Sequence, residues 1–543
     1  MRSDFVRIYK AVHTWTGILT GMALFIAFYA GALTVFKEPL ARWIAPPSEL
    51  HQISLDEAPQ LITQTLAERP ESRKDFTLHL REAEHLPSRM GWQTKDADAD
   101  DHDESSVRHF VATLDTNGAP HIQEHHPSAL PHFIDVLHRV VGLPVDTDPN
   151  RWIMGIIAAL YTLALISGVV VLIPSLVKDF FALRVGKNLK RMWLDAHNVV
   201  GIVSLPFHLV MALTAVVFAY HDGIYYLQDK LIHDGQWGTA FQRQPPAEGP
   251  HASRDPAQML PPLELVAKAR GVSPGFTPSM LQYQRVTSPR AIVRVWGKDE
   301  TAVSPRARGG FLALDPYTGR VLSSDFLPGQ QSTPNLFISS FFALHMAAFG
   351  GTPVQWMYFL LGLAGAWLFY SGNLLWVESR RRKQARDAAA PPRQRRDTRL
   401  MAAATVGVCL GCICGISLAL VGGKWLHALG GGEASALLYY SAFFAAIAWA
   451  FLAGAGRAAV HLLWLACALT LAIPLTSLTG TLLPGSGLWA HGSPASLGVD
   501  LTALVGAACF ALMANATAHR LKQGREDSVW GAHGGKTATA PTN

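Results

Sequence analysis

Residues 13–36 read HTWTGILTGMALFIAFYAGALTVF, and they decide the fold class because residues 15–36 form one apolar run long enough to cross a lipid bilayer. Three basic residues, Arg2, Arg7 and Lys10, stand before the run. A secretory signal peptide has a shorter apolar core, and no small-residue cleavage site stands out before Pro46. We therefore expect a retained membrane anchor rather than a cleaved signal.

Further apolar runs of spanning length occur near residues 152–174, 199–220, 354–377, 401–421, 435–453, 459–483 and 498–518. Together with the first run they predict eight transmembrane helices. The composition agrees, because 49% of the 543 residues are hydrophobic, only 16% are charged and the mean hydropathy is +0.18. These values lie outside the usual range of soluble globular proteins. The predicted fold class is an α-helical membrane protein with a four-helix core and a C-terminal four-helix extension.

Basic residues set the expected orientation. They gather before the first span, at Lys178 to Arg191 and at Arg380 to Arg399, and the positive-inside rule places such loops in the cytoplasm with both termini. This distribution also explains the formal charge of +6 without a nucleic-acid partner, so we expect none. The pair Cys409 and Cys412 is followed by Ile413 rather than histidine, which excludes c-type haem attachment there.

Two long polar segments, about 37–150 and 221–350, are expected outside the cytoplasm. The second predicts a helix at 262–269, a strand at 291–296, and a strand at 310–314 that enters the turn DPYTG and leaves through residues 320–322. The first segment carries a weaker copy, with a helix near 55–67 and a strand at 110–114. Each therefore predicts a small α+β domain. The expected order is a first helix (1–36), a polar domain (37–150), two helices (151–220), a second polar domain (221–350), a fourth helix (351–380), a basic linker (381–399), four additional helices (400–520) and a cytoplasmic tail (521–543).

The first two thirds of the chain form a parallel repeat of span, polar domain and span. At the edges of its four spans stands a histidine with a glycine four or five residues later. The four pairs are His13 with Gly17, His138 with Gly142, His197 with Gly201, and His345 with Gly350. On a helix, a residue four positions on lies one turn away on the same face. A glycine there would give a flat macrocycle clearance beside the imidazole, so we expect these glycines to leave room for haem.

The predicted topology sorts these histidines into two pairs. His13 and His197 begin outward-going helices, whereas His138 and His345 precede inward-going ones. Each membrane face then has one bis-histidine site, with the two sites roughly 20 Å apart by helix rise and bilayer thickness. Zinc and copper favour three or four ligands at one depth, so two imidazoles per depth favour haem. A bis-imidazole haem relays electrons rather than binding oxygen.

Other readings of the histidines stay open. Interfacial histidines are common, and small residues also serve helix packing. His208 lies on the same face as His197, three turns deeper, and competes as a ligand. The weaker candidates are His221, His233 and His461, and a cluster at His121, His125, His126 and His132 that we expect to be a solvated loop. The acidic run KDADADDHDE at 95–104 is expected to be an exposed loop, with metal binding as the lesser alternative.

Several segments resemble the PepSY-associated transmembrane family, which includes inner-membrane ferric-siderophore reductases of Gram-negative bacteria. They are LHR at 137–139, DAHNVVGIVSLPF at 195–207, LDPYTGRVL at 314–322 and ALHMAAFGG at 343–351. The resemblance covers about residues 5–383. It implies a four-helix core with two b-type haems, periplasmic PepSY domains and reduction of siderophore-bound Fe(III) to Fe(II). The family's ligand histidines correspond to His13, His138, His197 and His345, whereas residues 400–520 depart from the minimal family pattern.

The sequence therefore predicts a membrane-bound ferric-siderophore reductase of the bacterial inner membrane. Electrons would enter at the His13/His197 haem and pass to the His138/His345 haem and then to the chelate. No glycine-rich nucleotide fingerprint follows a predicted strand, so the electron donor is expected to be a quinol or a redox protein. Two alternatives are a non-enzymatic PepSY protein that binds peptides or regulates a protease, and a transporter subunit for the siderophore or iron.

Overall fold

The computed structural model describes residues 3–95, 107–177, 181, 189–232, 253–306, 309–387 and 395–523. Several sequence-based expectations lie outside these residues: nearly all of the acidic run at 95–104, His233, part of each basic loop, and nearly all of the C-terminal tail.

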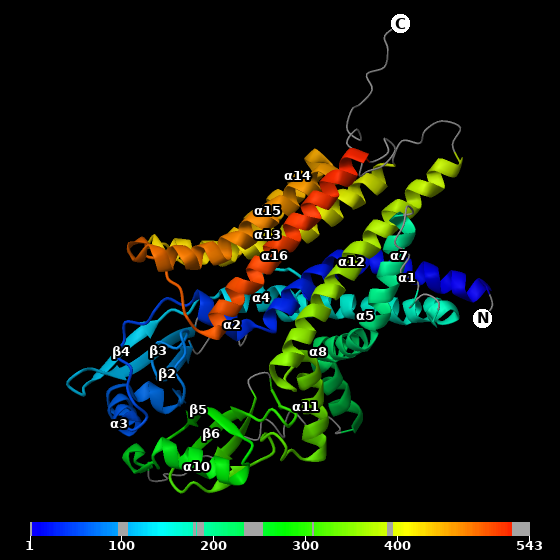
Figure 1. Ribbon diagram of the computed structural model, residues 1–543. Coiled ribbons are helices and arrows are strands. Elements are labelled where there is room, and N and C mark those ends of the chain that lie inside the picture. The colour runs from blue at the N-terminus through cyan, green and yellow to red at the C-terminus, as the bar shows by residue number, and fades with distance from the viewer. Residues whose placement is uncertain are drawn as a thin grey trace. The chain divides into compact units, whose positions relative to one another are not determined.

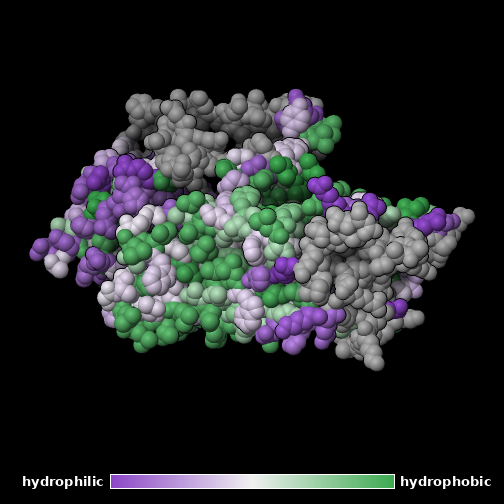
Figure 2. Space-filling view, turned by 90° about the horizontal axis from the view of Figure 1, so that it is seen from above, coloured by the Kyte–Doolittle hydropathy of each residue, from purple (hydrophilic) through white to green (hydrophobic). Residues whose placement is uncertain are grey.

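The eight expected spans are confirmed as helices that are long and apolar enough to cross a membrane, in the part of the chain that is described. They are α1 (Ser3–Thr34), α5 (Asp148–Leu172), α8 (Leu205–Ile232), α12 (Gly351–Asp387), α13 (Arg396–Ala428), α14 (Ser435–Ala453), α15 (Ala455–Leu482) and α16 (Pro494–Gln523) (Figure 1). Large apolar side chains on them are exposed, including Leu437, Leu452 and Leu512. Figure 2 shows a broad hydrophobic surface of the kind that faces lipid. The protein is a multi-pass membrane protein.

Four shorter helices adjoin the spans: α2 (Lys37–Ile44), α4 (Leu130–Arg139), α7 (Leu189–Val203) and α11 (Thr333–Met346). The apolar runs did not reveal α2, α4 and α11, because none of them has spanning length. The break between α7 and α8 has a local cause. Pro206 has no backbone N–H to continue the helical ladder, so a continuous helix is interrupted beside Ser204.

The chain divides into two compact units. The first contains residues 1–44, 128–213 and 358–543, and within it α13 packs on α14 and α15, and α15 packs on α16. Gly407, Gly411 and Gly415 line one face of α13, where an added Cβ would lie 2.8, 3.0 and 2.7 Å from atoms of α14. This small-residue stripe lets the two helix backbones approach closely. The neighbouring Cys409 and Cys412 are fully buried packing residues.

Buried polar groups connect α2 to the C-terminal helices. Trp43 is fully buried, and its indole N–H donates to Asp500 Oδ1 at 2.9 Å. Lys424, also fully buried, places its Nζ 3.8 Å from the centre of the Trp43 ring and donates to the Trp489 carbonyl at 3.1 Å. A buried cation and a half-buried carboxylate thus share one indole, and the opposite charge nearby offsets part of the cost of burying Lys424.

The second unit, residues 45–127 and 214–357, holds both polar segments. Their strands join in one antiparallel sheet of order β4-β3-β2-β1-β5-β6-β7-β8. The strands are β1 (Asp75–His79), β2 (Met90–Lys95), β3 (Val107–Leu114), β4 (Pro120–His125), β5 (Thr277–Gln284), β6 (Ile292–Lys298), β7 (Gly310–Leu314) and β8 (Val321–Ser323). We expected two separate domains, but β1 pairs with β5 from Asp75↔Gln284 to His79↔Met280 and fuses the two halves into one sheet.

Each half of the sheet contributes one helix, α3 (Ala58–Glu68) or α10 (Pro262–Val272), to a shared core. Phe76 and Tyr283 face each other across the β1–β5 junction with their rings stacked at 4.6 Å. The two repeats also end corresponding strands in matching turns, in which the Asp115 and Asp315 carboxylates accept backbone N–H bonds from Asn117 and Tyr317. The predicted α+β character and repeat are therefore present in the sheet unit.

Candidate functional site

His13 lies on α1 and contacts α5. Its Nδ1–H donates to the Ala164 carbonyl at 2.8 Å. The same imidazole packs on Gly168, one turn further along α5, where an added Cβ would lie 3.0 Å from the ring. Because glycine has no side chain, the imidazole can approach the α5 backbone closely enough to reach this carbonyl.

His138 repeats this arrangement between another pair of helices. It lies in the last turn of α4, and its Nδ1–H donates to the Ala27 carbonyl of α1 at 2.8 Å. Its ring packs on Gly31, again one turn beyond the acceptor, where an added Cβ would lie 2.7 Å from Nδ1. Two histidines on different helices thus use the same pattern, an alanine carbonyl followed four residues later by glycine.

The second half of the repeat anchors its histidines on hydroxyl groups. His197 Nδ1 lies 2.9 Å from Ser371 Oγ on α12, next to Gly372. His345, in the last turn of α11, has its Nδ1 2.8 Å from Thr214 Oγ1 on α8. The helix pairs correspond between the halves. The contact of His13 from α1 to α5 matches that of His197 from α7 to α12, and the contact of His138 from α4 to α1 matches that of His345 from α11 to α8.

These anchors determine which ring nitrogen carries the proton. A carbonyl oxygen can only accept, so Nδ1 of His13 and His138 must be protonated. The Ser371 hydroxyl donates to the Leu368 carbonyl at 3.1 Å, which leaves its oxygen to accept from His197 Nδ1–H. A neutral imidazole protonated at Nδ1 presents its lone pair at Nε2, and metal-ligating histidines are held in this way. His13, His138 and His197 therefore have the tautomer that ligation through Nε2 requires.

The glycines of the H-x-x-x-G motif fall into two groups. Gly17 and Gly201 lie on helices one turn from His13 and His197, and an added Cβ at either would meet no atom within 4 Å. The haem-clearance role expected of these two glycines stays a prediction.

Gly142 and Gly350 differ, because α4 ends at Arg139 and α11 ends at Met346, before either glycine. Their φ angles are +88° and +64°, and an added Cβ would meet Ile26 or Val354. Both glycines lie in the links after helix ends that Val141 and Ala347 form with φ angles of +51°, so the same-face argument for haem clearance is wrong at these two positions.

His208 shares the anchoring pattern of the four predicted ligands. Its Nδ1 contacts the Tyr161 hydroxyl, which also donates to the His208 carbonyl at 3.3 Å. Its ring packs on Gly365 of α12 and among Phe28 and Phe369. The side chain is 3% exposed and its Nε2 has no hydrogen-bond partner among the described residues. His208 therefore stays a competing candidate for a ligand.

Four of these histidines, all except His345, belong to the first compact unit. Among them, His197 lies close enough to His13 and His208 to interact electrostatically with both. This proximity supports the predicted pairing of His13 with His197. His138 belongs to the first unit and His345 to the second, so their pairing stays a prediction. Within the second unit, the Phe218 ring packs edge-on against His345 at 5.1 Å.

The remaining histidine candidates have ordinary surroundings. His121 and His125 lie on the edge strand β4, where His125 faces His109 across the ladder. Burial, together with the nearby His109 and His126, lowers the pKa of His125 below its usual value. His461 on α15 accepts a hydrogen bond from Trp449. No group of three or more His, Cys, Asp or Glu in the described ranges could hold a metal ion, so the sheet histidines form no metal cluster there.

Helices of membrane-spanning length and a sheet built from a repeat define a polytopic membrane protein with anchored histidines in its helical part. The family profile described as the PepSY-associated TM region matches residues 11–379. The chain therefore belongs to the PepSY-associated transmembrane family. No curated protein sequence matches it.

The anchors themselves were not foreseen from the sequence, although a signal for them exists. Ala164 lies 26 residues after His138, and Ser371 lies 26 residues after His345. Small residues at equal spacing in both repeats, each next to or one turn before a glycine, mark where an imidazole can reach a neighbouring helix. The pattern requires knowledge of which helices pair, and that information is tertiary.

Proposed function

We propose that the protein binds two b-type haems, one through His13 and His197 and the other through His138 and His345, and carries electrons across the bacterial inner membrane. The observation that carries this proposal is the anchoring of all four imidazoles through Nδ1, which in His13, His138 and His197 leaves the lone pair on Nε2, the atom through which we propose they bind iron. The open space beside Gly17 and Gly201 fits a flat macrocycle on the same faces.

A haem with two imidazole ligands supplies reversible one-electron chemistry with little rearrangement. The protein's own residues then have three tasks. The Nδ1 anchors orient the rings and raise their basicity, the glycines allow close approach, and apolar side chains such as Phe28 exclude water. Ionisable groups at membrane depth are expensive to bury, so five anchored histidines favour a functional role over packing.

The proposed overall reaction is reduction of a ferric siderophore outside the cytoplasm, which releases Fe(II) for uptake. The substrate follows from the resemblance to ferric-siderophore reductases of the same family. The donor is a quinol or a redox protein, and both termini face the cytoplasm in this proposal.

Liposomes that enclose a membrane-impermeant reductant test the proposal. Purified protein reconstituted in them should reduce an external ferric siderophore, as measured with an external Fe(II) trap. His13→Ala should abolish this reduction, whereas His461→Ala, which removes a membrane histidine outside the set, should not change it. Equal rates with His13→Ala and the unaltered protein would contradict transmembrane electron transfer through these sites.

A further inference from the structure

The sheet has two unlike faces. Val293 and Val295 on β6 are fully buried under α3 and α10, and β-strand alternation places Arg294 and Trp296 on the opposite face. Both of these residues are half-buried. The face away from the helices therefore carries large side chains that the shared core does not use.

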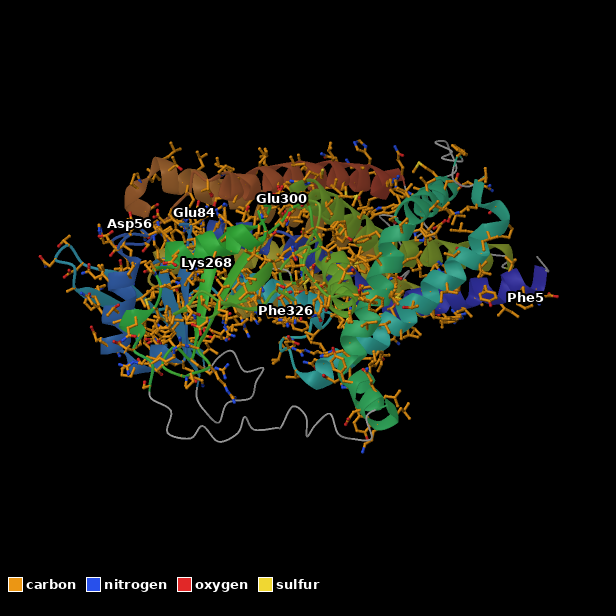
Figure 3. The ribbon with its side chains drawn as sticks, turned by 90° about the horizontal axis from the view of Figure 1, so that it is seen from below. Phe5, Asp56, Glu84, Lys268, Glu300 and Phe326 are labelled. Carbon is orange, nitrogen blue, oxygen red and sulfur yellow. The ribbon has the colours of Figure 1, made fainter. Side chains whose placement is uncertain are left out.

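An aromatic row crosses this face. The rings of Trp296 and Phe311 are directly opposite on β6 and β7, with centroids 4.7 Å apart. Phe311 stacks in turn on Phe326, in the segment after β8, at 5.0 Å and an interplanar angle of 13°. Figure 3 labels Phe326 and, on α10, Lys268. The three rings and Arg294, whose Cζ lies 5.1 Å from the Phe311 centroid, are called the aromatic row below.

Arg294 lacks the counter-charge that comparable arginines of this unit have. Arg108 lies 5.1 Å from the Phe110 centroid and makes two hydrogen bonds to Glu124, at 3.0 and 2.6 Å. Arg254, over Tyr317, likewise makes two bonds to the Asp315 carboxylate. The Arg294 guanidinium has no acceptor among the described residues, and its Nε is buried.

The polar groups beside Arg294 have other hydrogen-bond partners. Gln282 stands directly opposite it on β5, but the Gln282 amide donates to Asp75, at 3.0 Å to Oδ2, and its oxygen accepts from Trp296 Nε1 at 3.2 Å. A half-buried guanidinium with no acceptor is a site prepared for an anion, because arginine recognises carboxylate-like and phenolate oxygens through its paired N–H groups.

We infer that the aromatic row docks an anionic ferric chelate whose ligands are aromatic rings bearing ionised oxygens, a catecholate or phenolate type. The inference rests on the proposed function and names the substrate class. Ligand rings would stack on Trp296, Phe311 and Phe326, and the ionised oxygens would accept from Arg294. A neutral or cationic hydroxamate chelate has neither aromatic ligand rings nor a net negative charge.

Gallium(III) complexes test this docking without reduction, because Ga(III) matches Fe(III) in size and charge and is not reduced under these conditions. Full-length protein in nanodiscs would be titrated calorimetrically with a Ga(III) tricatecholate and a Ga(III) trihydroxamate. The tricatecholate should bind more tightly, and Arg294→Gln should weaken its binding about 10- to 100-fold. Arg294→Lys keeps the charge but loses the planar fork. Its affinity for the tricatecholate should lie between those of the unaltered protein and of Arg294→Gln.

Arg108→Gln is the matched control, since Arg108 lies over an aromatic ring but already has Glu124. It should leave tricatecholate binding unchanged. Unchanged binding with Arg294→Gln, an equal loss with Arg108→Gln, or equal binding of the two chelates would each overturn the inference. Circular dichroism and thermal unfolding verify that each variant is folded. Binding of the Ga(III) chelates is measured independently of haem content. An absorbance spectrum without haem would therefore contradict the proposed function but would not change the test of chelate docking.

Discussion

Replacing Gly31 by alanine perturbs the His138 anchor without touching the histidine. The added Cβ would lie 2.7 Å from His138 Nδ1 and 2.9 Å from Cε1. Non-bonded atoms of this kind prefer about 3.5 Å, so the imidazole must move by roughly 0.8 Å. That movement pulls Nδ1 away from the Ala27 carbonyl, which it reaches at 2.8 Å.

The magnitude follows from three terms. Overpacking costs about 1–3 kcal/mol and loss of the anchor bond about 1 kcal/mol. Alanine is a better helix former than glycine by about 1 kcal/mol, which offsets part of this cost. The net loss of about 1–3 kcal/mol corresponds to a haem dissociation constant about 5- to 150-fold higher at the His138 site.

Haem transfer to an excess of apomyoglobin measures this effect. Gly31→Ala should release one haem faster than the unaltered protein does, while the other haem is retained. Gly168→Ala should weaken the His13 site less, because its added Cβ would lie at 3.0 Å, and Gly372→Ala should do least, at 3.5 Å from His197.

Gly506→Ala is the matched control on another membrane helix, where the added Cβ would make an ordinary contact at 3.5 Å with Thr470. It should leave haem release unchanged. The reasoning fails if Gly31→Ala retains both haems as firmly as the unaltered protein, or if the three substitutions do not follow the order of their contact distances.

Three further predictions concern other parts of the chain. Gly17→Leu should leave the fold intact and lose one haem, because open space beside this glycine accommodates a side chain only when the cofactor is absent; haem content and circular dichroism together measure this. Asp500→Asn should lower the stability of the C-terminal helices by about 1–3 kcal/mol because it removes the half-buried negative charge that shares the Trp43 indole with the buried Lys424 cation, whereas the double variant Asp500→Leu/Lys424→Met should recover most of the thermal stability. Burial raises the pKa of Asp315, but hydrogen bonds from Arg254 and the backbone outweigh it and hold this pKa below its usual value. The sheet unit should therefore lose stability as pH falls below about 4, and Asp315→Asn should flatten this acid dependence in a thermal unfolding series.

Some features of the fold could be predicted because they are local. An apolar run such as residues 15–36 is recognised as a membrane span by its own length and composition. The strand Gly310–Leu314 with its following turn was predicted with the bounds that the structure gives. The pairing of β1 with β5 could not be predicted in this way, because strands separated by some 200 residues leave no mark in either local pattern.

The candidate site was predictable only in part for the same reason. His13 and His138 stood out through the repeat, but their anchors at Ala164 and Ala27 are alanine carbonyls, which any residue could supply. The prediction that Gly142 gives clearance for haem was wrong because the H-x-x-x-G pattern occurs both within a continuous helix and across a helix end. Only the position of Arg139 as the last helical residue of α4 separates these cases.

The haem content of purified protein tests the account most directly. A pyridine haemochrome assay should give two haems per chain for the unaltered protein and one after alanine replacement of any one of His13, His197, His138 or His345. The double variant His13→Ala/His197→Ala should lose no more haem than either single variant, because both residues hold the same cofactor. Full haem content after loss of any of the four histidines would contradict the ligand assignment.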